Sequence, residues 1–244
     1  MTAVNSTLWY VRLITLFPEL FPGPLGISCV GQALKSSVWS LSTVFLRDFG
    51  LGMHKTVDGP PCGGGAGMVL RCDVMEKALE KARQGLEYPR LVYFSPRGRV
   101  LTQNDLACWS VERRPLVGIC GRYEGLDQRI LDHYGIEEIS MGDYILAGGE
   151  IAAMAMIEGI VRLLPGVMGN ENSATEESFA HGLLEAPQYA RPVLWNGHNV
   201  PSVLVSGHHQ KIARWRREQS EKLTQRMRPD LWAEYEKCAK IQEN

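Results

Sequence analysis

Short apolar runs of strand length alternate with helix-like patterns through the first two-thirds of the chain. The apolar runs predict strands at residues 10–16, 43–49, 90–94, 116–120 and 144–146. Helix-like patterns lie between them, at residues 73–83, 105–112 and 126–134. This alternation predicts an α/β fold with a largely parallel sheet. The apolar runs are continuous rather than alternating, which predicts that helices cover both faces of the sheet.

A further helix, predicted at residues 150–164, is apolar almost all round, with Ala, Ile or Met at most positions of its first half. Such a helix must be buried, either in a core or against another subunit. Because a thin α/β layer offers one helix few neighbours, we favour a dimer interface as its place.

The character of the sequence changes after Pro165 and Gly166. Residues 168–178 (MGNENSATEES) contain almost nothing large and apolar, which is typical of a linker. A smaller, Pro-punctuated and then helical region follows. The pattern therefore predicts a domain over residues 1–167, a flexible linker over 168–178 and a mostly helical C-terminal domain over 179–244.

The composition is that of an ordinary globular protein, with 45% hydrophobic and 22% charged residues in a chain of 244. The first residues lack the basic segment of a signal peptide, and Arg12 interrupts their apolar run. No apolar run reaches about 18 residues, so no membrane span is expected. The six cysteines form no CxxC pair and no zinc-ligand spacing, which predicts core cysteines in a reducing compartment and hence a cytoplasmic protein.

Charge is distributed unevenly. The formal net charge of −1 counts against a globally basic nucleic-acid-binding protein. Residues 208–228, however, hold seven Lys or Arg and only two Glu. A helix is predicted over residues 208–227, and it would place Ile212, Leu223 and Met227 on one side, away from most of the basic residues. A charged helix face is usually just solvated, but this density of basic residues around Trp215 suits contacts to RNA phosphates better.

Four glycine-bearing segments are candidates for chemistry. They are HKTVDGPPCGGGAGM (residues 54–68), SPRG (95–98), GICGRYEG (118–125) and MGDYILAGGE (141–150). None is a GxGxxG at a strand–helix junction or a GxxxxGK[ST] loop, which disfavours the usual dinucleotide and nucleoside-triphosphate sites. Three of them follow or flank predicted strands, where ligands of α/β proteins bind, and glycine lets backbone groups approach a ligand such as a purine edge. The alternative is plain turn geometry.

These segments and others resemble one known family. The residues LITLFPELF, RDFG, HKTVDGPPCGGGAGM, YFSPRG, CGRYEG, MGDYILAGGE, PGVMG, ATEESF, GLLEAPQYARP and SGHHQKIARWR occur in this order over nearly the whole chain. Together they look like the bacterial tRNA (guanine-N1)-methyltransferase family of the SPOUT superfamily. The resemblance implies a deep trefoil knot in the sheet, a homodimer with shared active sites, and methyl transfer from S-adenosylmethionine to N1 of the guanine at tRNA position 37, beside the anticodon.

The resemblance also implies a cofactor pocket made by three loops. Its residues would be Tyr93, Phe94, Ser95 and Pro96 on the first loop, Gly121, Tyr123, Glu124 and Gly125 on the second, and Met141, Gly142, Tyr144, Leu146, Gly148 and Gly149 on the third. Apolar groups would cover the adenine, backbone groups would read its edge, and Glu124 would accept ribose hydroxyls. Without the resemblance, Glu124 is a solvated loop acid.

N1 of guanine carries a proton at neutral pH, so its methylation needs a general base and a positive group that stabilises charge on O6. Glu177 stands where the family has an aspartate as base, and Glu176 beside it is an alternative. Two acids in a polar linker are otherwise just solvated charges. Arg162 matches the family arginine that stabilises the guanine; alternatively it pairs with Glu158, four residues earlier on the same helix.

Substrate contacts are expected at two further places. Asp58 and the glycine run that includes Gly67 match the family's guanine-reading segment, although Gly59 and Pro60 stand where the family often has Asp-Arg. On the basic helix, tRNA contacts are expected at Lys211, Arg214 and Arg217. We also expect the linker to be poorly ordered without RNA and to fold over the site when RNA binds.

Alternative functions remain open at this point. One is a SPOUT methyltransferase for another RNA or for a ribose hydroxyl, although a ribose enzyme would have little need for Asp58 as a base reader. Another is a catalytically silent, cofactor-dependent RNA-binding module, favoured only by the glutamate at position 177. Absence of a GxSxG elbow disfavours a hydrolase, and N1 methylation needs no nucleophile such as Cys120. The family suggests a Mg²⁺ requirement, but no ligand cluster in the sequence points to a metal site.

Overall fold

The computed structural model describes residues 8–169 and 177–242. Contacts between residues divide the chain into two units, Met1–Gly169 and Asn170–Asn244. The predicted linker lies mostly outside the described residues, as does Glu176. The predicted domain limits and the ordering of the linker by RNA therefore remain predictions.

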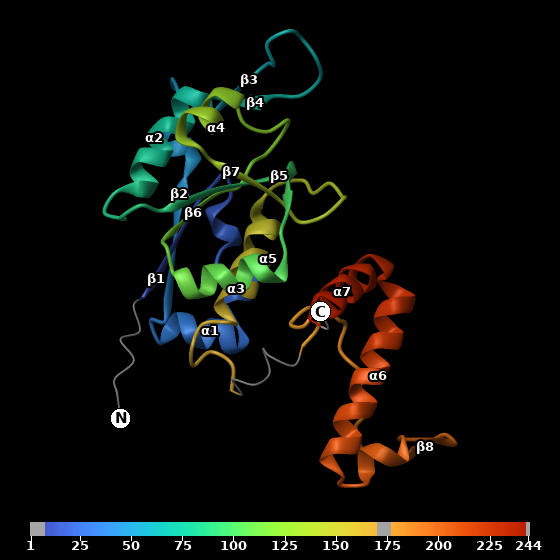
Figure 1. Cartoon of the computed structure of the whole chain (residues 1–244). Helices are drawn as coiled ribbons and strands as arrows, with labels where there is room; N and C mark the ends of the chain where they lie inside the picture. The colour runs from blue at the N-terminus through green and yellow to red at the C-terminus, as the bar shows by residue number, and fades with distance from the viewer. Residues whose placement is uncertain (1–7, 170–176, 243–244) are drawn as a thin grey trace. The chain divides into compact units, whose positions relative to one another are not determined.

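The first unit is built on a five-stranded sheet in which every pairing is parallel, as the sequence predicted (Figure 1). In spatial order the strands are β2 (Trp39–Phe45), β1 (Trp9–Thr15), β6 (Leu116–Ile119), β5 (Arg90–Val100) and β7 (Glu137–Ser140). Connections between parallel strands need crossovers, and helices supply most of them.

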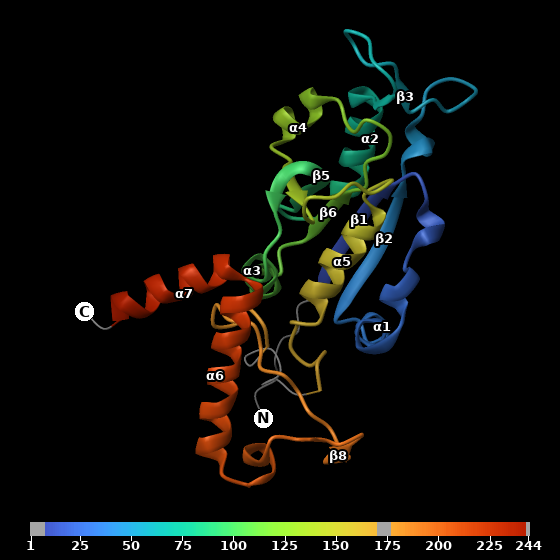
Figure 2. The same cartoon turned by 90° about the vertical axis from the view of Figure 1, so that its right-hand side faces the viewer.

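Helices cover both faces of this sheet. Val11 and Leu13 of β1 point into one apolar cluster, whereas Ile14 and Leu16 belong to a second cluster on the opposite face. The first cluster is completed by α1 (Ser28–Lys35), α3 (Gln103–Glu112) and α5 (Glu150–Val161). The second is completed by α2 (Cys72–Arg83) and α4 (Gln128–Tyr134) (Figure 2). A strand buried on both sides needs apolar residues at successive positions, which explains the continuous runs.

Two of the five predicted strands were wrong in position. The run at residues 43–49 straddles the end of β2, which stops before a 3₁₀ turn, η3 (Leu46–Phe49). Residues 144–146 lie in a loop, and the fifth strand is β7, whose sequence is EEIS. β7 has no apolar run because it begins with two glutamates, which the strand tolerates because they form ion pairs with arginines of β5. Those partners lie 47 and 41 residues away in sequence, so no local pattern reveals them.

The apolar helix α5 is buried by its own chain. Gly159 has no room for a side chain, because a Cβ there would lie 2.7 Å from Leu106 of α3. On another side, Met154 faces a 3₁₀ turn, η2 (Gly23–Gly26), where a Cβ at Gly23 would lie 3.5 Å from Cε of Met154. Most of this helix is thus buried in the core of its own chain, the first of the two places expected for it, and its place in a dimer interface remains a prediction. Among its apolar residues, Ile151 remains 59% exposed.

The second unit is smaller and largely helical. Its elements are a hairpin of β8 (Leu194–Trp195) and β9 (His198–Asn199), a 3₁₀ turn η5 (Ser202–Val205), α6 (His209–Met227) and α7 (Pro229–Gln242). The predicted helix at 208–227 is thus confirmed. Thr224 is fully buried in α6, and its hydroxyl oxygen accepts a hydrogen bond of 2.9 Å from the backbone N–H of Leu184.

The prediction that the cysteines are core residues is confirmed for Cys120 and wrong for three others, while Cys29 and Cys72 are half-buried and pack against the two apolar clusters. All six are free, and Cys120 alone is buried. Cys62, Cys108 and Cys238 are exposed, because they lie on a loop and on solvent-facing positions of helices. Across residues 8–169 and 177–242, no helix is long and apolar enough to cross a membrane.

Candidate active site

A pocket of about 340 Å³ lies at the carboxyl ends of β5, β6 and β7, three neighbouring strands. Its wall is formed by a bulge within β5 and by the loops that follow β6 and β7, and every residue that the resemblance placed in a cofactor pocket lines it. Its volume lies at the lower end of the range of small-molecule sites, about 300–1,000 Å³. The structure thus brings together residues from three segments that are far apart in the sequence, at the edge of the sheet where ligands of α/β proteins bind.

The first loop is a bulge within β5. Phe94 and Arg99 both stand opposite Ile139 of β7, so the residues between them, Ser95 to Gly98, leave the sheet and return to the same partner. Gly98 is pressed against the backbone of Glu138, where a side chain would not fit. The bulge thereby brings Ser95 and Pro96 out of the sheet, and both residues line the pocket.

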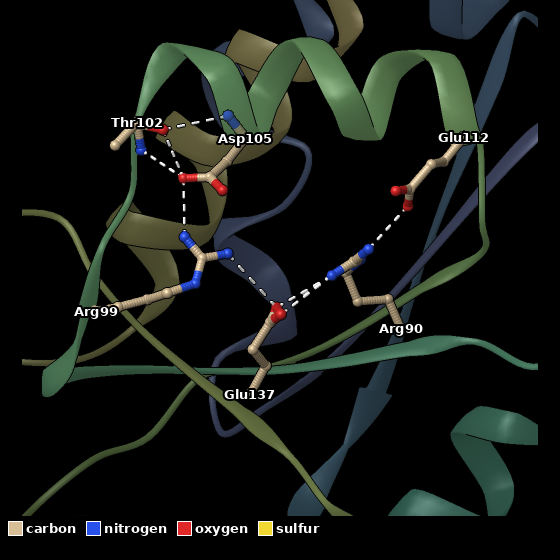
Figure 3. A network of polar contacts seen from close by, with 6 residues as sticks. All are labelled: Arg90, Arg99, Thr102, Asp105, Glu112 and Glu137. Carbon is tan, nitrogen blue, oxygen red and sulfur yellow. Dashed lines mark hydrogen bonds and ion pairs between the residues drawn. The ribbon is translucent and has the colours of Figure 1, made fainter.

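An ion-pair network fixes the base of this bulge (Figure 3). Arg90 before the bulge lies 3.1 Å from Glu137, and Arg99 after it lies 2.8 Å from Asp105 and 3.8 Å from the same Glu137. Both guanidinium groups also stand over the ring of Trp109 in α3, with Arg90 Cζ 4.4 Å from its centroid. Both ends of the bulge are therefore tied to β7 and to α3.

The second loop requires glycine on steric grounds. A Cβ at Gly121 would lie 2.6 Å from Cε2 of Tyr93, and one at Gly125, where φ is +104°, would lie 2.7 Å from the Tyr93 hydroxyl. Tyr93 is itself buried, and burial raises its pKa above the ordinary value. Glycine at these two positions thus allows the turn and the close packing against Tyr93, and Gly121 and Gly125 both line the pocket.

The glycine run of residues 54–68 meets the second loop. It contains the first strand and the loop of a hairpin whose strands are β3 (Asp58–Gly59) and β4 (Val69–Leu70). Gly67, with φ of +85°, lies against the carboxylate of Glu124, and the Glu124 N–H donates to the carbonyl of Met68 at 2.9 Å. Asp58, the candidate residue for reading guanine, is half-buried in β3. It therefore belongs to a hairpin that contacts the second loop of the pocket.

The third loop rests on a buried acid that sequence reasoning missed. Glu150, the first residue of α5, is 1% exposed and lies 3.0 Å from Arg122 of the second loop. Arg97 and Arg122, which also line the pocket, were missed as well. All three stand inside the glycine-bearing motifs, so the motifs contained the signal.

The two candidate catalytic residues belong to different units. Arg162 follows the last residue of α5 and is half-buried in the first unit, where its backbone N–H donates to the carbonyl of Glu158 at 3.0 Å. Glu177 is half-buried in the second unit, and its carbonyl accepts from the N–H of Ala180 at 3.2 Å. Their roles remain predictions.

The candidate tRNA-binding residues lie exposed on α6. Arg214 pairs with Glu218 at 2.9 Å and Arg217 with Glu221 at 3.1 Å, each one helical turn away. The basic surface is thus partly neutralised by its own helix. Lys211 has no ion-pair partner within the described part of the chain.

Nucleophilic catalysis by Cys120 finds no support at this site. Cys120 is 2% exposed, and burial raises its pKa well above the ordinary value, so its thiol is protonated near neutral pH and unsuited to nucleophilic attack. The described residues contain no group of three His, Cys, Asp or Glu side chains placed to hold a metal ion.

A parallel sheet whose carboxyl-end loops enclose a ligand-sized pocket defines the class as an α/β protein with a small-molecule site at its strand ends. A family model described as tRNA (Guanine-1)-methyltransferase TrmD matches residues 9–234. The chain belongs to this family, which is part of the SPOUT superfamily of trefoil-knot proteins. The knot comes with the family, because such topologies are too rare to infer from a strand pattern.

Curated relatives agree with this assignment. A tRNA (guanine-N(1)-)-methyltransferase of Ruegeria sp. (strain TM1040) is 55% identical over 230 residues, covering 93% of this chain and 93% of the relative. A protein of the same name from Cereibacter sphaeroides (strain KD131 / KCTC 12085) is 53% identical over 235 residues, covering 95% and 93%. Another, from Rhodopseudomonas palustris (strain TIE-1), is 53% identical over 225 residues, covering 92% and 90%.

Proposed function

We propose that this protein transfers a methyl group from S-adenosylmethionine to N1 of guanosine at tRNA position 37, next to the anticodon. The observation that carries the proposal is the convergence of three family motifs, far apart in sequence, on one pocket at the strand ends. Relatives that match over more than nine-tenths of this chain bear the name of that activity.

The pocket suits the methyl donor in its chemistry. Met141 and Leu146 offer apolar surface for an adenine ring, while the glycines of the second and third loops expose backbone N–H and C=O groups to its edge. Glu124 stands at the rim as an acceptor for ribose hydroxyls. When bound, the donor supplies an activated methyl group on a sulfonium sulfur, and the pocket residues orient it towards the guanine.

The chain's own residues would then move the proton and stabilise the charge. Glu177 accepts the N1 proton of guanine, and Arg162 stabilises the negative charge that develops on O6. Asp58 and Gly67, in the hairpin against the second loop, contact the base. Specificity comes from a guanine turned out of a single-stranded loop, as in other enzymes that act on RNA bases.

The remaining partners are part of the same proposal. Lys211, Arg214 and Arg217 on α6 bind tRNA phosphates and so position the substrate. Two copies of the chain form a homodimer with shared active sites; exposed Ile145 and Ile151, near the pocket, are apolar surface that a second copy would cover. Such an enzyme works in the cytoplasm, where its tRNA substrate is.

Methyl transfer to unmodified tRNA transcripts tests the proposal. Labelled S-adenosylmethionine is supplied with transcripts that carry guanine or adenine at position 37, using wild type, Glu177→Gln and Glu176→Gln. We expect label only in the guanine transcript, a loss of at least about a hundredfold in Glu177→Gln, and near-normal transfer in Glu176→Gln. Loss of methyl transfer in Glu176→Gln instead would identify Glu176, not Glu177, as the general base. Donor binding without transfer to either transcript would mean another RNA substrate or a catalytically silent module.

A further inference from the structure

Glu150 is a charged residue in an unusual place. Only 1% of it is exposed, and its Oε1 accepts a hydrogen bond of 2.8 Å from the hydroxyl of Thr15 at the end of β1. Its Oε2 has no hydrogen bond of good geometry to any described residue, although Arg122 lies within ion-pair distance. Withdrawing a carboxylate from water costs several kcal/mol unless a partner compensates, so the fold keeps this acid only if its contacts matter.

The compensating partner is Arg122, which also joins two loops of the pocket. Its Nη2 lies 3.0 Å from Glu150 Oε2, and its Nη1 donates to the carbonyl of Ala147 at 3.3 Å. The guanidinium is stacked over the ring of Phe17, with Cζ 4.4 Å from the centroid. Arg122 belongs to the second loop and Ala147 to the third, and both line the pocket. One guanidinium therefore holds the two loops together.

The third loop is packed directly on this ion pair. A Cβ at Gly148 would lie 2.6 Å from Arg122 Cζ and 2.6 Å from Glu150 Oε2. The backbone at Gly148 can therefore lie this close to the guanidinium and the carboxylate only because the residue has no side chain. A second tie runs nearby, since the N–H of Gly149 donates to the carbonyl of Gly121 at 3.1 Å.

We propose that Glu150 is a positioning residue for the methyl donor: it orients Arg122, and through Arg122 it sets the spacing of the second and third pocket loops. This inference rests on the proposed function. Glu150 does not line the pocket, so it acts through Arg122 rather than by touching the donor. A preformed spacing lowers the conformational cost of binding, which the donor would otherwise have to supply.

The test compares Glu150→Gln with Thr15→Val as a matched control. Glutamine keeps the shape and the contact to Thr15 but removes the charge that holds Arg122. Thr15→Val leaves that charge in place and removes the hydrogen bond that Thr15 donates to Oε1, together with the one that its hydroxyl oxygen accepts from the N–H of Phe17. Binding of S-adenosylhomocysteine is measured by calorimetry, with KM for donor and for tRNA and thermal unfolding alongside. We expect donor-site affinity to fall about 10- to 100-fold in Glu150→Gln, with an unchanged KM for tRNA, and to stay within about twofold in Thr15→Val.

Two more variants separate positioning from a purely structural role. In an Arg122→Gln background, Glu150→Gln should cause no further loss of affinity, because its effect passes through Arg122. Phe17→Leu removes the aromatic ring that stacks on Arg122 but keeps an apolar side chain at a partly exposed position, so it should fold and weaken binding about threefold. It keeps the proposal testable should Glu150→Gln fail to fold.

Several outcomes would overturn the proposal. One is wild-type affinity in Glu150→Gln, or in Phe17→Leu if Glu150→Gln does not fold. Another is an equal loss from Glu150→Gln with and without Arg122, since Glu150 would then act independently. Failure of the wild-type protein to bind S-adenosylhomocysteine would instead refute the proposed function and this inference with it, which distinguishes the two.

Discussion

The two units of this protein are built in different ways. The first buries two apolar clusters, one on each face of a parallel sheet, and its pocket sits at the edge of that sheet. Within the described part of the second unit, Ala186 and Thr224 are the buried residues, and the long helix α6 exposes most of its length. The pocket, whose loops are closely packed, thus belongs to the unit with the larger core.

The difference follows from what each unit has to recognise. A small ligand must be enclosed by groups held in fixed positions, and close packing provides such positions. A nucleic-acid backbone is a broad array of charges that can be met by side chains reaching out from an exposed helix. Three predictions test this contrast, in order of decreasing expected effect.

The largest effect is expected from a methyl group added at Gly149. An alanine Cβ there would lie 2.9 Å from Cα of Cys120 and 3.2 Å from N of Gly121, and backbone atoms cannot move aside as side chains do. Overpacking of this kind costs about 1–3 kcal/mol of unfolding free energy and should reduce donor affinity more than about tenfold. Urea unfolding and calorimetry with S-adenosylhomocysteine measure the two effects.

Gly169→Ala is the matched control, because a Cβ at Gly169 would meet nothing within 4 Å. We expect it to unfold and to bind ligand as wild type does. If the two alanine variants had the same unfolding free energy and ligand affinity, the wall of the pocket would be able to accommodate the added methyl group. That result would contradict the rigidity that the packing of the first unit implies.

An intermediate effect is expected from acid, and here the two units should behave alike. A hydrogen bond from Arg129 lowers the pKa of Asp127 to about 2 in the first unit, and one from Arg228 lowers that of Asp230 to about 2 in the second. Because both pKa values are lower in the folded than in the unfolded state, the unfolded chain binds more protons between about pH 4 and pH 2. The stability that these pairs contribute is present above about pH 4 and is lost as the pH falls towards 2.

Urea midpoints between pH 5 and pH 3 check this dependence. Asp127 also caps α4 by accepting from the N–H of Arg129 at 3.0 Å. Asp127→Asn keeps a capping side chain but cannot titrate, so the acid-induced loss should shrink in that variant. If the urea midpoint fell just as steeply with pH in Asp127→Asn as in wild type, the Asp127–Arg129 pair would not contribute to the loss of stability in acid.

The smallest effects concern α6, and they should have opposite signs. Lys211→Gln should flatten the dependence of log affinity for tRNA on log salt concentration by about 0.7–0.9, the contribution of one phosphate contact. Glu218→Gln should steepen it, because it releases Arg214 from its ion pair for contact with RNA. Filter binding of tRNA over a range of salt concentrations measures both slopes. Parallel lines for all three proteins would show that this part of α6 lies away from the RNA.

Local sequence predicted the elements well where a strand or helix follows from its own residues. The continuous runs at β1, β5 and β6 and the amphipathic patterns of α2 and α6 were placed to within a few residues, apart from the bulge that lengthens β5. It misplaced β2 and missed β7, whose glutamates are compatible with a strand only because of the partners Arg90 and Arg97 on β5.

The candidate site divides in the same way. The motifs named the residues of three loops, and all of them line one pocket. Arg122 and Glu150 were overlooked, although they lie inside two of those motifs, because their significance depends on burial and on a contact across 28 residues. The pairing of Arg214 with Glu218, by contrast, is a one-turn relation that a sequence can display.

By itself, then, the sequence determined the family, the α/β class, the helical C-terminal region and the loops of the pocket, because these depend on local periodicity and on motifs in a fixed order. Only the tertiary structure decided which neighbours bury α5, why Gly121 and Gly149 have no room for a side chain, and how Glu150 is held without solvent. Packing distances and burial are properties of atoms brought together from distant segments, so no local pattern of residues contains them.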